Sequence, residues 1–202
     1  MTATAERLLK TLARHIRDER VLAAVRSVPR DVFVPPSLRD EAWENIPLPI
    51  GADQTISQPL VVARMLELLE LKGDERVLDV GTGSGYHAAL LAQLAAHVWS
   101  IEIHAELSAR AAAALAAAGI GNVTLIIGDG GAGWPDAAPY DAVNVAAAAE
   151  DDVPAALVEQ LGPHGRLIAP VEHGDQHLVL IRRTDGDVQR TRLERVRFVP
   201  LT

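Results

Sequence analysis

The chain contains no cysteine, which excludes disulfide bonds, zinc-thiolate sites and cysteine nucleophiles. Aromatic residues are scarce at 3%, so a core has to be built mainly from Leu, Val, Ile and Ala. No apolar run is long enough to span a membrane. Residues 1–20 mix charged with apolar side chains and lack the apolar centre of a signal peptide. These absences favour a protein of the reducing cytoplasm with no membrane partner.

Basic residues are too few to balance the acidic ones, since 19 Lys and Arg against 27 Asp and Glu give a net charge of -8. Nonspecific nucleic-acid binding depends on Lys and Arg that neutralise phosphates, so we expect no nucleic-acid partner. The length of 202 residues suits one domain. Within it we expect a helical, substrate-side segment over residues 1–58 and a cofactor-binding α/β core over residues 59–202. No long exposed apolar helix is evident, which favours a monomer.

The N-terminal third combines helical periodicity with a proline-rich stretch. Apolar positions at helical spacing predict one or two helices over residues 5–28, ended by Pro29. Residues 31–59 contain five prolines and are expected to be irregular but anchored by apolar side chains. A further helix is predicted over residues 59–71, with Gly73 as its stop signal.

From Arg76 onward, predicted strands and helices alternate. The strands cover residues 76–80, 97–101, 123–127, 140–145 and 166–171, and the helices cover residues 86–95, 105–118 and 153–161. This alternation predicts an α/β fold with a mainly parallel sheet. The runs 176–183 and 188–199 flank an Asp-Gly pair, which predicts an antiparallel hairpin. A parallel sheet with such an end is typical of the Rossmann-like S-adenosylmethionine-dependent methyltransferases.

The strongest local motif is the glycine-rich turn of Val77–Tyr86, read as VLDVGTGSGY. Glycines between a strand and a helix let the backbone approach a ligand, and the helix start offers free N–H donors. Glu102 ends the next strand about 20 residues beyond the first glycine, as a ribose-binding acid does. Asp129 ends the third strand and is placed to approach an adenine ring. NAD is disfavoured because Tyr86 replaces the third glycine of its fingerprint.

Further segments carry a resemblance to one family. They are Val28–Pro35, Pro47–Gly51, Gln54–Pro59, Ile126–Gly130, Ala138–Asp141, Gly165–Leu167 and Val196–Leu201. Together with the glycine motif they resemble the protein-L-isoaspartate O-methyltransferases over nearly the whole chain. Thr55-Ile-Ser57 and the closing Phe198–Leu201 are particular to that family, whereas the glycine motif is shared by methyltransferases generally.

The resemblance implies methyl transfer from S-adenosyl-L-methionine to the α-carboxylate of L-isoaspartyl residues in damaged proteins or peptides. The ester then cyclises to a succinimide, whose hydrolysis regenerates some aspartate. Ser57 is implied as the active-site hydroxyl. The expected cofactor-binding residues are Asp79, Gly81, Thr82, Gly83, Ser84, Glu102, Asp129 and Gly130, and the expected substrate-side residues are Thr55, Ile56 and Ala146.

Some of these residues have plainer alternative roles. Thr55 and Ser57 precede a predicted helix, and without the resemblance a capping role would be preferred. Asp79 could order the glycine loop, and Glu102 or Asp129 taken alone could be a solvated carboxylate. No metal is assigned, because no metal-ligand spacing with carboxylates is formed by His164, His173 and His177. His87 is interpreted as a helix-surface or satisfied residue. A solvated strand face is the interpretation for Arg190, Arg192, Arg195 and Arg197.

Three places depart from the family pattern. Ala146 stands where Thr or Gly is usual, and Asp53 and Glu172 stand where Gly is usual. The same loop as Ala146 adds the acids Glu150, Asp151 and Asp152. Acids bordering the cleft would repel a carboxylate, so we hypothesise a shift toward peptides with flanking Lys or Arg. Two other functions stay open: methylation of a normal Asp in a dedicated peptide, and a cofactor-binding adaptor without catalysis.

Overall fold

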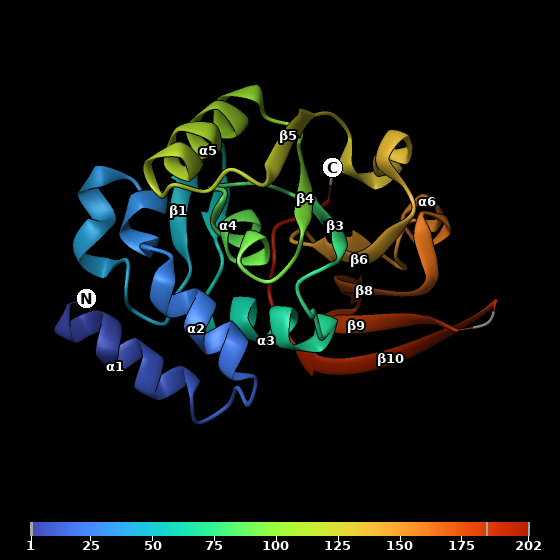
Figure 1. Cartoon of the computed structure of the whole chain (residues 1–202), viewed down its shortest axis with the longest axis horizontal. Coiled ribbons are helices and arrows are strands. Elements are labelled where there is room, and N and C mark those ends of the chain that lie inside the picture. The colour runs from blue at the N-terminus through green and yellow to red at the C-terminus, as the bar shows by residue number, and fades with distance from the viewer. Residues whose placement is uncertain (1, 185, 202) are drawn as a thin grey trace.

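The computed structural model describes residues 2–184 and 186–201; Met1, Asp185 and Thr202 lie outside the described residues. Two N-terminal helices, α1 (Ala3–Leu12) and α2 (Glu19–Ser27), confirm the helical prediction. The segment forms two helices and not one, since each helix has its own N-cap: the Thr2 and Asp18 side chains accept backbone N–H groups at the starts of α1 and α2. Figure 1 shows both helices at one end of the molecule and the hairpin of β9 (Asp175–Thr184) and β10 (Asp187–Arg195) extending from the other.

The proline-rich stretch is more regular than its sequence predicts. Two 3₁₀ helices, η1 (Arg30–Phe33) and η2 (Pro36–Glu41), precede a small hairpin of β1 (Leu48–Gly51) and β2 (Gln54–Ile56). The hairpin turn consists of Ala52 and Asp53, both with positive φ, at 51° and 56°. Two positive φ values in a two-residue loop are the pattern of a type I′ turn, although neither residue is glycine. Sequence reasoning missed this hairpin.

Helix α3 (Pro59–Leu69) begins at the proline, as expected, but its predicted stop is wrong. The helix ends at Leu69, and its C-cap Glu70 takes the left-handed conformation with φ of 50°. Glu70 is held there by ion pairs with Arg166 and Arg182. Gly73, with φ of 118°, lies in the turn that leads to the sheet.

The central sheet has the strand order β10-β9-β8-β6-β3-β4-β5, with β7 added beside β8. Its strands are β3 (Arg76–Val80), β4 (His97–Glu102), β5 (Val123–Ile127), β6 (Tyr140–Val145), β7 (Ala149–Glu150), β8 (Leu161–His173), β9 (Asp175–Thr184) and β10 (Asp187–Arg195). All pairs among β3 to β8 are parallel, and β8–β9 and β9–β10 are antiparallel. The predicted α/β fold and terminal hairpin are confirmed, although the predicted turn residue Asp185 lies outside the described residues.

Alternating side chains of the sheet belong to two hydrophobic cores. Val77 packs with α1 to α5, including α4 (Tyr86–Ala92) and α5 (Ala105–Ala117), whereas Leu78 packs on the opposite face with α6 (Ala155–Glu159). Asp79 points to the same face as Val77, and it pairs in register with Ser100 and Asn144 on the neighbouring strands. These three polar residues form the polar set of this face. The polar set is fully buried and lies directly beneath the glycine loop.

Strand β10 is shorter than predicted and ends at Arg195. The chain then crosses to the carboxyl end of β6. There the Ala148 N–H donates to the Val199 carbonyl at 2.7 Å, and the Ala148 carbonyl accepts from the Leu201 N–H at 2.8 Å. This crossing brings residues 199–201 over the carboxyl ends of the parallel strands. Among the described residues, none of the helices has the length and apolar composition of a membrane span.

Candidate active site

The glycine loop between β3 and α4 is shaped by three positive φ values, 88° at Gly81, 53° at Gly83 and 87° at Gly85. The N–H groups of Gly81 and Thr82 both donate to the Ile101 carbonyl, at 2.9 and 3.1 Å. The loop is therefore fastened to the end of β4. A Cβ atom at Gly85 would lie 3.1 Å from the Ala111 Cβ, so glycine is also required for α4 to lie close to α5.

A buried hydrogen-bond network supports this loop from below. The Asp79 carboxylate accepts from Ser100 Oγ and from Asn144 Nδ2, each at 2.8 Å, and Ser100 Oγ lies 2.7 Å from Thr82 Oγ1. Burial raises the pKa of Asp79 to about 6, which the two hydrogen bonds oppose and the nearby Glu102 reinforces. Asp79 does not line the cleft; its contacts fit the loop-ordering role. Sequence reasoning missed Ser100 and Asn144, which are polar residues in otherwise apolar strands.

Glu102 has the geometry expected of a ribose-binding acid. It is buried, lines the cleft, and accepts from the Gly83 N–H at 2.8 Å and from the His104 N–H at 2.9 Å, one bond to each carboxylate oxygen. Each oxygen of a carboxylate has a second lone pair, so a pair of hydroxyl groups can still bind here. The two backbone donors fix the carboxylate in place before any ligand arrives.

Gly130 and Asp129 behave differently, although the sequence placed them together. Gly130 lines the cleft, and a Cβ there would lie 2.5 Å from Val80 Cγ1, so only glycine fits. The Asp129 side chain is exposed and accepts from the Gly131 N–H at 2.8 Å as the cap of the 3₁₀ helix η3 (Gly130–Ala132). One oxygen of the Asp129 carboxylate is therefore used as a local cap, and its approach to an adenine ring stays a prediction.

Ser57 lies on the other side of the same cleft, between β2 and α3. The capping role weighed for Ser57 and Thr55 is wrong, because α3 has Gln58 as its N-cap and the Leu60 N–H donates to Asn45 Oδ1 at 3.0 Å. The Ser57 carbonyl accepts from the buried Arg30 guanidinium at 3.2 Å, which also donates to Ala42 and Ile46. Its backbone is thus anchored while its hydroxyl borders the cleft.

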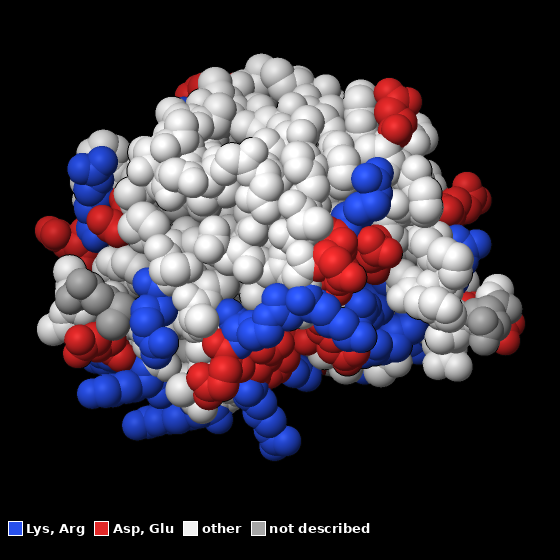
Figure 2. Space-filling model, in the orientation of Figure 1, with Lys and Arg blue, Asp and Glu red and all other residues white. Residues whose placement is uncertain are grey.

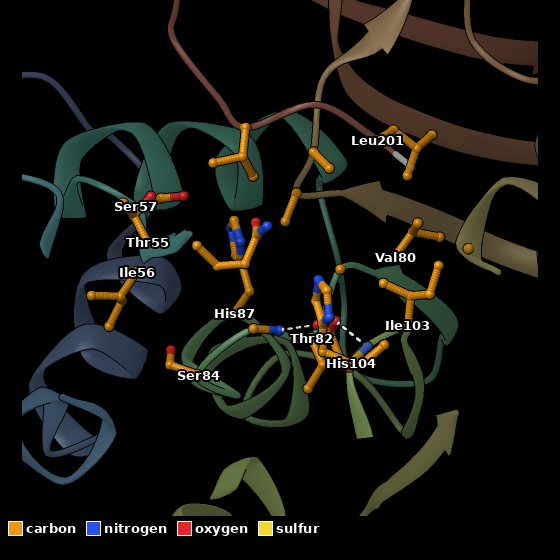
Figure 3. A pocket seen from close by; sticks show the side chains of 18 of the residues that line it. Thr55, Ile56, Ser57, Val80, Thr82, Ser84, His87, Ile103, His104 and Leu201 are labelled. Carbon is orange, nitrogen blue, oxygen red and sulfur yellow. Dashed lines mark hydrogen bonds between the residues drawn. The ribbon is translucent and has the colours of Figure 1, made fainter. Parts of the chain in front are cut away.

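The cleft joins the two groups of residues that the sequence singled out. Figure 3 shows Thr55, Ile56 and Ser57 on one side and Thr82 and His104 on the other. The lining includes Gly81–Ser84, Glu102, Gly130, Ala146 and the C-terminal residues Val199, Pro200 and Leu201. Of the expected site residues, only Asp79 and Asp129 do not line it. Ser84 also accepts from the Tyr86 N–H at 3.3 Å at the start of α4.

A second groove of about 320 Å³ opens beside Ser57. Thr55 and Ser57 line both cavities, so the groove adjoins the cleft. Its far wall is formed by Arg195, Val196, Arg197 and Phe198. This arrangement corrects the interpretation of the basic strand as a wholly solvated face, since two of its arginines border the groove next to Ser57.

The acidic residues expected to border the cleft lie away from it. Neither the cleft nor the adjoining groove is lined by Glu150, Asp151, Asp152 or Glu172. Asp152 forms an ion pair with Arg190, and Glu172 accepts from Gln176 Nε2 at 2.8 Å. Figure 2 shows the densest group of charged side chains, of both signs, in the lower half of this face. The hypothesised repulsion of a carboxylate by these acids therefore has no support in this geometry.

His87 is not on the helix surface, contrary to the sequence interpretation. It is 6% exposed and lines the cleft. Burial lowers the pKa of His87 to about 4, with a hydrogen bond to the Val62 backbone opposing the shift and the Arg30 charge adding to it. Within the described part of the chain, no group of three or more His, Asp or Glu side chains is arranged to hold a metal ion.

The chain matches the family described as protein-L-isoaspartate(D-aspartate) O-methyltransferase over residues 3–202. The chain belongs to this family. It is 54% identical to protein-L-isoaspartate O-methyltransferase 1 of Rhodopseudomonas palustris (strain HaA2), over 94% of this chain and 78% of that one. It is 55% identical to the enzyme of the same name from Anaeromyxobacter sp. (strain Fw109-5), over 100% of this chain and 96% of that one.

Solved structures of the family share this fold. A protein-L-isoaspartate O-methyltransferase matches with a TM-score of 0.87 at 28% identity, covering 97% of this chain and 65% of that chain. A putative family member from Plasmodium falciparum, in complex with S-adenosyl-L-homocysteine, matches with a TM-score of 0.86 at 26% identity and covers 96% of both chains. As a member of this family, the present chain is a methyltransferase whose cofactor is S-adenosyl-L-methionine.

The residues of the cleft fit that cofactor. Glu102 offers acceptors for a pair of ribose hydroxyls, and the bare backbone at Gly81 and Gly130 leaves room for close approach. Val80, Ile101 and Ile103 provide apolar surface beside the glycines, suited to an adenine ring.

Proposed function

We propose that the cleft methylates the α-carboxylate of L-isoaspartyl residues in proteins or peptides, with Ser57 as the hydroxyl that binds the acceptor. The main support is that Ser57 lines the same cleft as Glu102 and the glycine loop. Ser57 is not the N-cap of α3, so its hydroxyl is not used in capping that helix. Acceptor and cofactor residues thus face one another across a single space. The family description and the names of the curated relatives support the same activity.

The chemistry suits a site that has few titratable groups. When bound, S-adenosyl-L-methionine supplies an electrophilic methyl group on a sulfonium that leaves readily. The acceptor carboxylate is ionised near neutral pH and needs no general base. Aligning oxygen, methyl carbon and sulfur is therefore the main task of the protein, and such positioning supplies several kcal/mol. A C–O bond forms as the C–S bond breaks, and no proton moves.

The strength of carboxylate binding also matters. The reaction consumes an anion and a cation, so a site that binds the carboxylate too tightly stabilises the reactants more than the transition state. A serine hydroxyl is a moderate donor, whereas an arginine clamp would hold the anion strongly. In this chain the nearby arginine, Arg30, directs its guanidinium to backbone carbonyls instead. Arg30 is thus bonded to the Ser57 carbonyl and not to its hydroxyl, while Arg195 and Arg197 line the adjoining groove.

Methyl transfer onto matched peptides tests the proposal. Two peptides would carry L-isoaspartate or L-aspartate at one position in an otherwise identical sequence, and mass spectrometry would follow the methyl ester. Methylation of the isoaspartyl peptide alone is expected. Methylation of an aspartyl peptide alone would indicate a dedicated peptide substrate. Cofactor binding without transfer to either peptide would indicate an adaptor.

We propose that residues 1–58 form the substrate side of one domain, because β2 and Ser57 reach the cleft from that segment. We further propose a monomer that acts in the cytoplasm without nucleic acid. Light scattering of the purified protein checks the first of these properties, and a dimer would contradict it.

A further inference from the structure

The groove beside Ser57 extends the acceptor side of the cleft. Thr55 and Ser57 line it, whereas none of the residues expected to bind the cofactor does. Both residues lie across the cleft from Thr82 and His104 (Figure 3). A groove of this volume is roughly 7 Å wide, the length of two residues of an extended chain. Residues that flank an isoaspartate bound at Ser57 would therefore enter it.

The charge of this groove is positive. Within the described part of the chain, its lining contains Arg195 and Arg197 but no Asp or Glu. Arg195 Nη2 lies 2.5 Å from Asp175 Oδ1, so an ion pair offsets part of the Arg195 charge. Arg197 is exposed, and no carboxylate of the described residues forms an ion pair with it. Arg197 is therefore the more available of the two charges.

The backbone on both sides of Arg197 is held by Gln176. The Val196 N–H donates to the Gln176 carbonyl at 3.0 Å, and the Phe198 N–H donates to Gln176 Oε1 at 2.6 Å. Gln176 Nε2 donates in turn to the Phe198 carbonyl at 3.2 Å. Val196 and Phe198 also pack against the hydrophobic core. Because this backbone is already fixed, a ligand of Arg197 has to order only its side chain, which lowers the entropy cost of binding.

We propose that the groove favours isoaspartyl substrates with Asp or Glu within about two residues of the isoaspartate, and that Arg197 is the main specificity-determining residue. The inference rests on the proposed function and names the substrate class of that site. A net charge of -8 gives the chain no general attraction for acidic peptides, so such a preference would arise locally. Its sign is opposite to the preference for flanking Lys or Arg hypothesised from the sequence.

Methylation kinetics of the full chain test the inference on isoaspartyl peptides that carry Glu, Gln or Lys at one flanking position, before or after the isoaspartate. On at least one side, kcat/KM of the wild type should be about twofold to fivefold higher with Glu than with Gln, and lowest with Lys. Added salt should reduce the difference, because both arginines are exposed.

Two substitutions assign the preference to Arg197. Arg197→Gln should bring the ratio of the Glu to the Gln peptide close to one, and Arg197→Glu should reverse the order of the Glu and Lys peptides. Arg190→Gln is the matched control, since Arg190 lies on the same strand but pairs with Asp152 outside the groove. This variant should keep the wild-type ratio.

Equal kcat/KM for the Glu and Gln peptides in the wild type would overturn the inference, as would a higher value for the Lys peptide. An equal loss with all three peptides in Arg197→Gln would also overturn it, because the arginine would then act on the reacting carboxylate or on folding. Should the Arg197 variants fail to fold, the peptide and salt series of the wild type decides. Absence of methyl ester on every isoaspartyl peptide refutes the proposed function, and the inference with it.

Discussion

At the scale of single residues, two carboxylates in this site have opposite tasks that their surroundings assign. Asp79 is buried beneath the glycine loop, and its carboxylate accepts hydrogen bonds from Ser100 and Asn144. Glu102, one strand away, is fixed by two backbone N–H groups but opens into the cleft. The first stabilises the loop, and the second is available to a ligand.

Replacing Glu102 by Gln should weaken cofactor binding. The amide would place an NH₂ group against one of the two backbone donors and would lose a charged acceptor for a hydroxyl. Because hydrogen bonds to charged groups contribute about 1.5–3 kcal/mol, the Kd for S-adenosylhomocysteine should rise roughly tenfold to a hundredfold. Isothermal calorimetry measures this change. Glu150→Gln, outside the cleft, serves as the control, and equal effects of the two substitutions would refute the assignment.

Ser57 and Asn45 should separate activity from stability. Ser57→Ala is expected to lower kcat/KM roughly tenfold or more, since a hydrogen bond to a charged acceptor is lost. Its free energy of unfolding should change by less than about 0.5 kcal/mol, because Asn45 bonds the start of α3. Asn45→Ala should instead lower the free energy of unfolding by about 1 kcal/mol. Urea denaturation and steady-state assays of both variants check this, and a large loss of stability in Ser57→Ala would contradict it.

The buried His87 also predicts a pH dependence of stability. Its pKa is about 4 in the folded chain against an ordinary value of 6.5, so the unfolded chain binds more protons between these values. This group therefore removes stability as the pH falls through that window. Relative to wild type, His87→Gln should gain about 2–3 kcal/mol of unfolding free energy between pH 7 and pH 4.5.

Asp79 provides the comparison of opposite sign. Its pKa is about 6 in the folded chain against 3.8 ordinarily, so its contribution is lost as the pH rises through that window. Relative to wild type, Asp79→Asn should therefore lose unfolding free energy as the pH falls from 7 to 4.5. Urea denaturation at both pH values measures the two variants. A difference from wild type that does not change with pH, in either variant, would contradict the buried environments described.

At the scale of secondary-structure elements, the sequence predicts the strands of the sheet well because apolar runs and Gly-rich turns are local signals. Glu102 at a strand end and the loop Gly81–Gly85 are found for the same reason. Three features escape such reasoning, since each depends on contacts between distant segments. The Asn45 bond to α3 spans 15 positions, the Ser100–Asp79 bond spans 21, and the Arg30–Ser57 bond spans 27.

The β1–β2 hairpin was missed for a different reason. Its turn uses Ala52 and Asp53 with positive φ where glycine is the common signal. Ala52→Gly should therefore stabilise the chain by about 0.5–1 kcal/mol, because alanine is strained in this conformation. The same exchange at Ala112, exposed within α5, should destabilise it by about 1 kcal/mol. Denaturation midpoints of the two variants check these signs, and a loss of stability in Ala52→Gly would contradict the turn geometry.

At the scale of the whole molecule, the site forms where three separate parts of the chain meet at one edge of the sheet. The carboxyl ends of β3 and β4 provide the glycine loop and Glu102, the N-terminal hairpin provides Ser57, and residues 199–201 complete the lining. Ligands of open α/β sheets bind at this edge. The described lining of the cleft includes Glu102 but no Lys or Arg, whereas Arg195 and Arg197 line the adjoining groove next to Ser57.

Conversion of a peptide from isoaspartate to aspartate tests the central claim most directly. A purified isoaspartyl peptide would be incubated with the protein and S-adenosyl-L-methionine, and chromatography with mass spectrometry would follow both isomers. We predict that the aspartyl peptide accumulates, with a succinimide before it, only when protein and cofactor are both present. Isoaspartyl peptide that persists unchanged, in a sample that still binds S-adenosylhomocysteine, would contradict the account.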